Sequence, residues 1–245
     1  MDVFKKIIKY LITKLNSFLD IFYKINIKDG EYYLDYNLKS YAQWESKQLV
    51  RDIIREKIDT SRDPGWQKSG AKTREEYKMY SWQICGMACL KMILKSIYPE
   101  KRYKLVHLAK EAQKYGVYKK KNISDITANL DGLFPYPFIQ FIKKYNLKGH
   151  RKIGVKENYL AKLILKNKFI IASVHHTIRE DNPPQNTKRG HLVLIVGFKV
   201  KNKKVLGFYV NNPSGYYKIS QEKHFVSLKN WRKCFIGNCI IIEKK

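Results

Sequence analysis

A cysteine is the first residue in the sequence whose type and position could do chemistry. Cys85 lies where a helix would begin, directly before a stretch in which apolar side chains fall on every helical face. A helix that is apolar all round belongs inside a domain. At its first turn, unpaired backbone N–H groups and the helix dipole favour an anion, so we expect a lowered thiol pKa and a nucleophilic Cys85. The alternative is a small buried apolar residue, which is the role of most free cysteines.

A histidine and an asparagine are predicted to meet at one end of a β-hairpin. A strand begins at His191, residues 201–204 form its turn, and the return strand ends at Asn211 and Asn212. Residues equidistant from a turn face each other in an antiparallel pair. The midpoint of positions 191 and 212 falls inside the turn. His191 and the two asparagines should therefore be neighbours, with a bulge able to shift the pairing by one residue.

Cysteine, histidine and asparagine together are the parts of a thiol hydrolase. Cys85 would attack a carbonyl carbon, and His191 would take the thiol proton and later donate it to the leaving amine. Asn212 would fix the tautomer of the imidazole and aim the ring. For any single histidine, a core residue at the end of a strand is the commoner interpretation. The three types in this order favour catalysis.

The elements that must position these residues change in character along the chain. Helical signals come first, and β-branched and aromatic runs with tight turns follow, which predicts an α+β domain with an antiparallel sheet. Thr73 and Glu76 form a capping box that would start a short helix leading toward Cys85. The longer expected helices span 1–25, 46–58, 86–97, 105–112, 137–145 and 160–164, and the expected strands span 32–36, 169–175, 191–200, 205–210, 216–219 and 239–243.

The N-terminal helix is amphipathic, with apolar residues from Ile7 to Phe22 at helical spacing and lysines over much of the remainder. Charges interrupt the apolar run, so it is neither a transmembrane span nor a signal peptide, and we expect a cytoplasmic protein. The helix could pack on its own domain, which is the commoner outcome, or lie weakly on an anionic membrane surface. We predict an N-terminal extension over 1–28 and a catalytic domain over 31–245.

The composition of the chain limits the kinds of partner that we expect it to bind. The chain has 245 residues and a formal net charge of +28, but its lysines are scattered and no nucleic-acid-binding motif accompanies them, so we expect no nucleic-acid partner. The charge would steer an acidic peptide or an anionic polymer toward the protein. The four cysteines, at 85, 89, 234 and 239, have spacings too loose for a structural zinc site. We expect no metal, no cofactor and a reducing compartment.

Two motifs resemble a known family. Cys85-Gly86-x-Ala88-Cys89-Leu90-x-Met92 is similar to the nucleophile helix of the papain-like bacteriocin-processing peptidases and their stand-alone relatives, cysteine peptidase family thirty-nine. Gly190-His191, leading into a β-run that ends in Asn-Pro, resembles the family's histidine motif and its Asp-Pro or Asn-Pro element. The resemblance covers roughly residues 31–245. It implies a papain-like fold and cleavage of a peptide bond.

The resemblance also implies a glutamine that helps to hold the oxyanion, about six residues before the cysteine in the processing peptidases. Met79 stands there in this chain. Tyr41-Ala42-Gln43-Trp44 is similar to a segment that carries this glutamine in stand-alone relatives, so we expect Gln43 to supply the donor, with Gln83 as the alternative. Residues 45–80 would then be a helical insertion between the oxyanion donor and the nucleophile.

Three functions follow from these observations. The first is a cysteine peptidase that uses Cys85, His191, Asn212 and Gln43 on a peptide or a peptide-like amide. The second, supported by the displaced glutamine, is a non-catalytic peptide-binding or accessory module on the same fold. The third is a different reaction of the same residues, either cell-wall amide hydrolysis or acyl transfer.

Overall fold

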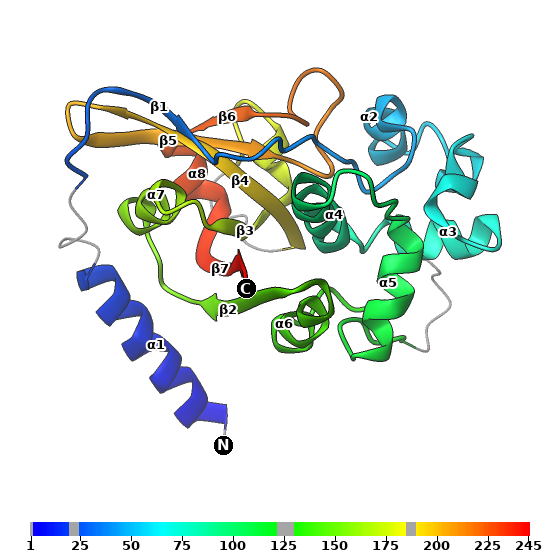
Figure 1. Ribbon diagram of the computed structural model, residues 1–245, viewed down its shortest axis with the longest axis horizontal. Helices are drawn as coiled ribbons and strands as arrows, with labels where there is room; N and C mark the ends of the chain where they lie inside the picture. The colour runs from blue at the N-terminus through cyan, green and yellow to red at the C-terminus, as the bar shows by residue number, and fades with distance from the viewer. Residues whose placement is uncertain (1, 20–24, 122–129, 185–189) are drawn as a thin grey trace.

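The computed structural model describes residues 2–19, 25–121, 130–184 and 190–245. In these ranges seven strands form one antiparallel sheet in the order β2-β7-β3-β4-β5-β6, with β1 on the side of β4. Helices pack around the sheet, which confirms the predicted α+β class (Figure 1). The strands are β1 (Gly30–Tyr33), β2 (Leu147–Lys152), β3 (Phe169–His175), β4 (Gly190–Lys201), β5 (Lys204–Asn211), β6 (His224–Ser227) and β7 (Phe235–Lys244).

Strand β4 organises the sheet because it pairs with three other strands. Its first half pairs with β3, its second half pairs with β1, and most of its length pairs with β5. Asn202 and Lys203 connect β4 to β5, and both have positive φ angles, of 50° and 59°. A two-residue turn of this kind matches the twist of the flanking strands. The hairpin predicted from the sequence is therefore present, with its turn centred on residues 202 and 203.

The buried helix predicted around residues 86–97 is α4 (Cys85–Ile97), which packs against β3, β4 and α5 (Figure 1). Nine of its residues are buried, in agreement with its apolar character on every face. The Thr73 hydroxyl caps the preceding helix by accepting a hydrogen bond from the Glu76 N–H at 3.1 Å. The other helices of the domain are α2 (Val50–Ile54), α3 (Arg74–Ser81), α5 (Leu105–Lys114), α6 (Pro135–Ile142), α7 (Glu157–Leu165) and α8 (Leu228–Cys234).

Several elements differ from the expectation. The strand predicted over 216–219 is wrong: these residues form successive turns, closed by the bond from the Ser220 N–H to the Tyr216 carbonyl at 2.9 Å. Strands β2 and β6 were not predicted: both are edge strands, β2 is mostly polar, and β6 has only four residues, of which two are apolar. Asn146, in the left-handed conformation at φ 56°, ends the helical segment that precedes β2.

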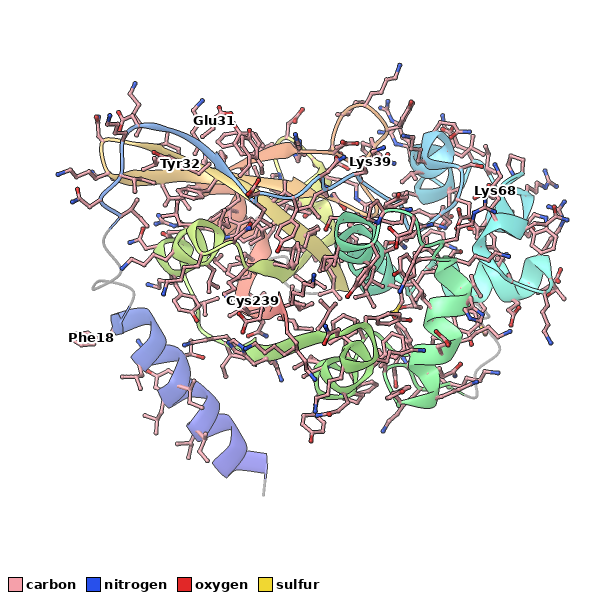
Figure 2. The ribbon with its side chains drawn as sticks, viewed as in Figure 1. Phe18, Glu31, Tyr32, Lys39, Lys68 and Cys239 are labelled. Atoms are coloured by element: carbon pink, nitrogen blue, oxygen red, sulfur yellow. The ribbon has the colours of Figure 1, made fainter. Side chains whose placement is uncertain are left out.

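The N-terminal helix α1 (Asp2–Leu19) exposes the large apolar side chains that the structure describes. Among its described side chains, Ile7, Leu11, Leu15 and Phe18 are 50–58% exposed. Figure 2 shows Phe18 projecting away from the rest of the protein. The backbone of α1 comes close to the domain at Thr13, which lies against Gly154. Ile7, Leu11 and Leu15 are therefore not buried against the domain, contrary to the commoner outcome expected for such a stripe. Phe22, expected on the same stripe, lies outside the described residues.

No helix within the described ranges is both long enough and apolar enough to cross a bilayer. The predicted boundary at residue 28 stays a prediction, as does the proposal that residues 45–80 are an insertion. This segment contains α2, most of α3 and three short 3-10 helices, Lys47–Leu49, Thr60–Arg62 and Trp66–Ser69. Buried Asp63 joins the start of this segment to α3, because its carboxylate accepts hydrogen bonds from the Ser46 and Tyr77 hydroxyls.

Candidate active site

A cavity of about 880 Å³ lies where the start of α4 meets the start of β4. Three of the four candidate residues line it: Gln43, Cys85 and His191. Asn212 is fully buried behind His191. The rest of the lining comes from both sides of the site and includes Trp44, Trp82, Gln83, Asp131, Leu133, Arg151, His176, Arg179, Leu192, Ser214 and Asn238.

Cys85 is the first residue of α4 and is 9% exposed, at the wall of the cavity. Gly86 follows Cys85 for a steric reason. A Cβ on Gly86 would collide with the side chain of Leu133 and press on that of Leu192, and both leucines line the cavity. The glycine therefore allows these two leucines to pack directly against the start of α4, next to the thiol.

The pKa of the Cys85 thiol is raised to about 11, mainly because the group is buried. Hydrogen bonds from the backbone of Leu192 and Gly86 act in the opposite direction but are weaker. The expected lowering of the thiol pKa at the helix start is therefore wrong. Desolvation of a thiolate exceeds the stabilisation that the first turn of α4 provides.

His191 is held in one orientation from behind. Its Nε2 lies 2.7 Å from Oδ1 of Asn212 and 3.0 Å from the Ser214 hydroxyl. The backbone N–H of Ser214 donates to the same Oδ1 at 3.0 Å, which identifies this atom as the oxygen of the amide. An amide oxygen can only accept, so the proton of the neutral imidazole lies on Nε2. Nδ1 therefore keeps its lone pair.

Asn212 contacts His191 as predicted, but it does so from a loop and not from a paired position in the hairpin. The β4–β5 pairing contains two irregularities and places Leu194 opposite Asn211. Asn212 follows the end of β5, and its own N–H donates to the Gln221 carbonyl at 2.8 Å. Its side chain reaches His191 from this loop and not from a ladder position directly opposite.

Burial lowers the pKa of His191 to about 3, and the positive charge of Arg179 adds to this effect. The hydrogen bond with Asn212 raises the pKa, but by less. At neutral pH both Cys85 and His191 are therefore uncharged in the free protein. The site holds a thiol and an imidazole, not a preformed pair of ions.

Gln43 lies in the cavity although 41 residues separate it from Cys85. Its backbone N–H donates to the Pro213 carbonyl at 2.9 Å, so its segment is bonded to the loop that holds Asn212. Its side-chain nitrogen donates to the Ser81 carbonyl at 2.8 Å, and the Trp82 carbonyl is 3.4 Å away. Met79 packs against the core from α3, while Gln83 also lines the cavity.

Two polar residues of the site were not predicted. Ser214 follows Asn212-Pro213 directly, so its position two residues after a turn-forming asparagine could have indicated its hydrogen bond to the asparagine side chain. Arg179 lies just after β3 and lines the cavity with only 6% of its surface exposed. Nothing in its sequence context distinguishes it from the many basic residues of the surface.

The cysteines are not paired. Cys85, Cys89, Cys234 and Cys239 are all buried and free. Among the described residues, no group of three or more histidine, cysteine or acidic side chains is placed to hold a metal ion.

Comparison with known proteins gives one match to a family and several distant structural neighbours. Residues 67–234 match the model of the Peptidase_C39 like family. No curated protein matches the chain.

Three solved structures illustrate the structural neighbours. A putative C39-like peptidase from Bacillus anthracis is 16% identical, with 66% of this chain and 90% of that chain covered and a TM-score of 0.47. The peptidase domain of Streptococcus ComA is 13% identical, with coverages of 66% and 93% and a TM-score of 0.40. A double glycine motif protease from an AMS/PCAT transporter, solved with a leader peptide, is 16% identical, with coverages of 67% and 86% and a TM-score of 0.39.

The family match spans more than two thirds of the chain and contains Cys85, His191 and Asn212. It agrees with the resemblance seen in the two sequence motifs and with the α+β architecture around the cavity. The chain belongs to the Peptidase_C39 like family.

Proposed function

We propose that the protein is a cysteine peptidase that hydrolyses a peptide or peptide-like amide bond with Cys85, His191 and Asn212. The observation that carries this proposal is the fixed imidazole. Its Nε2 is bonded to Asn212 at 2.7 Å, its Nδ1 keeps a lone pair, and the ring shares the cavity wall with a thiol at a helix start. A base oriented by a third group beside a nucleophile is the arrangement that nucleophilic catalysis requires.

Because Cys85 and His191 are both neutral in the free protein, the thiol must lose its proton as it attacks the substrate. As Cys85 Sγ attacks the carbonyl carbon, His191 Nδ1 takes the thiol proton, so the imidazolium forms only when substrate is present. The Asn212 oxygen stabilises the N–H that remains on Nε2. The imidazolium then donates its proton to the leaving amine, and water hydrolyses the thioester with His191 again acting as the base.

The negative oxygen of the tetrahedral intermediate needs hydrogen-bond donors. The Cys85 N–H at the start of α4 is one, and the Gln43 side chain is the second. One hydrogen of the Gln43 amide nitrogen is used by the Ser81 carbonyl at 2.8 Å. The other has only a long contact with the Trp82 carbonyl at 3.4 Å, which leaves it available for the oxyanion.

A peptide-binding module without turnover is the second candidate, and one observation favours it. A thiol with a pKa of about 11 holds almost no thiolate at neutral pH, so Cys85 depends entirely on His191 for activation. If His191 does not accept the proton, the cavity binds a peptide and does not cleave it.

The test is to incubate the protein with a mixture of proteome-derived peptides and to identify new termini by mass spectrometry. Wild type should generate new termini, while Cys85→Ala and His191→Ala should not. Cys89→Ala is the matched control, because it removes a fully buried thiol one turn further along α4 and should keep the activity. Identical peptide patterns for wild type and Cys85→Ala would contradict the peptidase proposal and favour the binding module.

We also propose that α1 contacts an anionic membrane surface. Its described apolar side chains are exposed, and Lys5, Lys6, Lys9 and Lys14 lie on the same helix. Apolar side chains can enter the headgroup region while lysines contact anionic lipids. The net charge of +28 supports the same partner.

A further inference from the structure

Arg179 is a buried cation that forms no ion pair with any residue that the structure describes. Its Nε donates to the His176 carbonyl at 2.8 Å. Its Nη1 is buried and has no hydrogen-bond partner in the part of the chain that the structure describes.

Two neighbouring groups, Tyr216 and Glu180, favour the charged form of Arg179, but neither accepts a hydrogen bond from its Nη1. Glu180 is adjacent in sequence, but its carboxylate accepts a hydrogen bond from the Tyr216 hydroxyl at 2.8 Å. The guanidinium carbon lies 6.0 Å from the centre of the Tyr216 ring, at the outer limit of a cation–π contact. Burying an unpaired charge destabilises a protein unless a partner compensates it. The fold therefore keeps an arginine here whose Nη1 has no partner among the described residues.

The position of Arg179 indicates that a partner for its guanidinium would come from the cavity. The residue lines the same cavity as Cys85 and His191. Its positive charge is near enough to contribute to the low pKa of His191. The acidic residue on the cavity wall, Asp131, is paired with Lys121 at 2.8 Å. The second arginine of the wall, Arg151, is exposed on β2.

We propose that Arg179 binds a carboxylate group of the peptide in the active-site cavity and so selects acidic substrates. A guanidinium presents several N–H groups in a planar fork that matches the two oxygens of a carboxylate. The carboxylate is either an acidic side chain or the C-terminus of the peptide. This inference rests on the proposed peptidase function for its biological meaning, but carboxylate binding can be measured without turnover.

The experiment uses the full chain with Cys85→Ala, which removes the nucleophile, and measures binding of short peptides by calorimetry. The reference peptide is acetyl-Ala-Gln-Ala amide. Acetyl-Ala-Glu-Ala amide adds only a side-chain carboxylate, and acetyl-Ala-Gln-Ala with a free C-terminus adds only a terminal one. We expect one of the two to bind at least about tenfold more tightly than the reference, as a charged hydrogen bond predicts. Equal binding of all three peptides would overturn the inference.

Variants in the same background assign the preference to one residue. Arg179→Gln should abolish it, and Arg179→Lys, which keeps the charge but loses the fork, should reduce it. Arg151→Gln is the matched control, because it removes an exposed arginine of the same cavity and should leave the preference intact. A preference that survives Arg179→Gln, or one that disappears in Arg151→Gln alone, would assign the carboxylate to another group and contradict the proposal.

The unfolding temperature separates binding from a structural role. If Arg179 only supported the fold, Arg179→Gln would lower the unfolding temperature and leave the relative affinities of the three peptides unchanged. Should that variant fail to fold, Arg179→Lys and the weakening of the preference by added salt still decide the question. Reactivity of Cys85 in the wild type is measured separately, so a failure of the peptidase proposal is distinguishable from a failure of carboxylate binding.

Discussion

At the residue scale, the central feature is the contact of His191 with Asn212. Because the Ser214 N–H fixes the asparagine oxygen, and the oxygen fixes the proton on Nε2, one short loop determines the protonation pattern of the imidazole. In the proposed mechanism, the fixed tautomer leaves Nδ1 of this buried, neutral histidine as the base on the cavity side.

Replacing Asn212 tests this contact. Asn212→Ala removes the acceptor, so the ring loses its orientation, and we expect kcat/KM to fall roughly 10- to 100-fold, the value of one or two hydrogen bonds to a group that becomes charged. Asn212→Asp keeps an acceptor at the same place and should retain most of the activity. Equal losses in the two variants, measured on a peptide that the wild type cleaves, would contradict an orienting role.

Where residue type and spacing carry the information, the sequence predicted which residues lie together. Cys85 and His191 line one cavity and Asn212 contacts His191, as the helix start and the hairpin indicated, while their catalytic roles stay a prediction. The pKa of Cys85 was not predictable, because it depends on burial by segments such as the loop containing Leu133 and the start of β4. Arg179 was not identifiable for a similar reason, since only the fold distinguishes a buried arginine from an exposed one.

At the element scale, the loop after β5 positions the site. It contains Asn212, Ser214 and Tyr216 and closes on itself through the bond from the Asn212 N–H to the Gln221 carbonyl at 2.8 Å. The sequence Tyr216–Ile219 was expected to be a strand because aromatic and β-branched residues favour strands. Two hydrogen bonds between Tyr216 and Ser220 hold the chain in turns instead: the Ser220 N–H donates to the Tyr216 carbonyl, and the Ser220 hydroxyl accepts from the Tyr216 N–H.

Gly215 is the residue of this loop that cannot carry a side chain. A Cβ there would collide with the backbone of Ser220, which cannot move without opening the loop. We expect Gly215→Ala to lower the free energy of unfolding by about 1–3 kcal/mol, the usual range for overpacking, and to reduce turnover. Gly132→Ala, at a cavity glycine with open space around it, is the control and should unfold like the wild type in urea.

Helix α1 has a separate test by co-sedimentation with vesicles of phosphatidylglycerol. At low salt the wild type should pellet with the vesicles, and Leu11→Glu with Leu15→Glu should not, because the apolar stripe then carries charge. Leu206→Glu with Ile219→Glu, at two exposed residues outside α1, adds the same two negative charges and controls for the loss of positive net charge. No pelleting of the wild type at low salt, or equal pelleting of all three proteins, would remove the membrane proposal.

At the scale of the whole molecule, burial of a neutral histidine makes stability depend on pH. The pKa of His191 is about 3 in the folded protein, against an ordinary value of 6.5. Below pH 6.5 the unfolded chain therefore binds a proton that the folded protein does not. The stability that neutral His191 contributes is complete above pH 6.5 and is lost as the pH falls toward 3, with a slope that approaches about 1.4 kcal/mol per pH unit.

A comparison of wild type with His191→Gln measures this dependence. The other histidines with lowered pKa values, His150, His175, His176 and His224, are present in both proteins. The difference in free energy of unfolding should therefore shift against the wild type between pH 7 and pH 5. Parallel curves over this range would mean that His191 is not held neutral by the fold.

The fold of the whole molecule was predictable in class but not in every strand. Apolar and β-branched runs indicated α4, β3, β4, β5 and β7, and all of these except β5 contribute residues to the cavity wall. Edge strands such as β2, with its polar run of lysine, histidine and arginine, carry no such signal. Gln43 was placed by resemblance, and it is the Pro213 carbonyl, distant in sequence, that holds its segment in the cavity.

The most direct test of the account is the rate at which a peptidyl vinyl sulfone modifies each cysteine, with the sites identified by mass spectrometry. Cys85 should be modified much faster than Cys89, and His191→Ala should slow Cys85 alone, because the imidazole must take the thiol proton as the sulfur attacks. If Cys85 reacts no faster than Cys89, or reacts equally in wild type and His191→Ala, the thiol is not activated by His191 and the proposed mechanism is wrong.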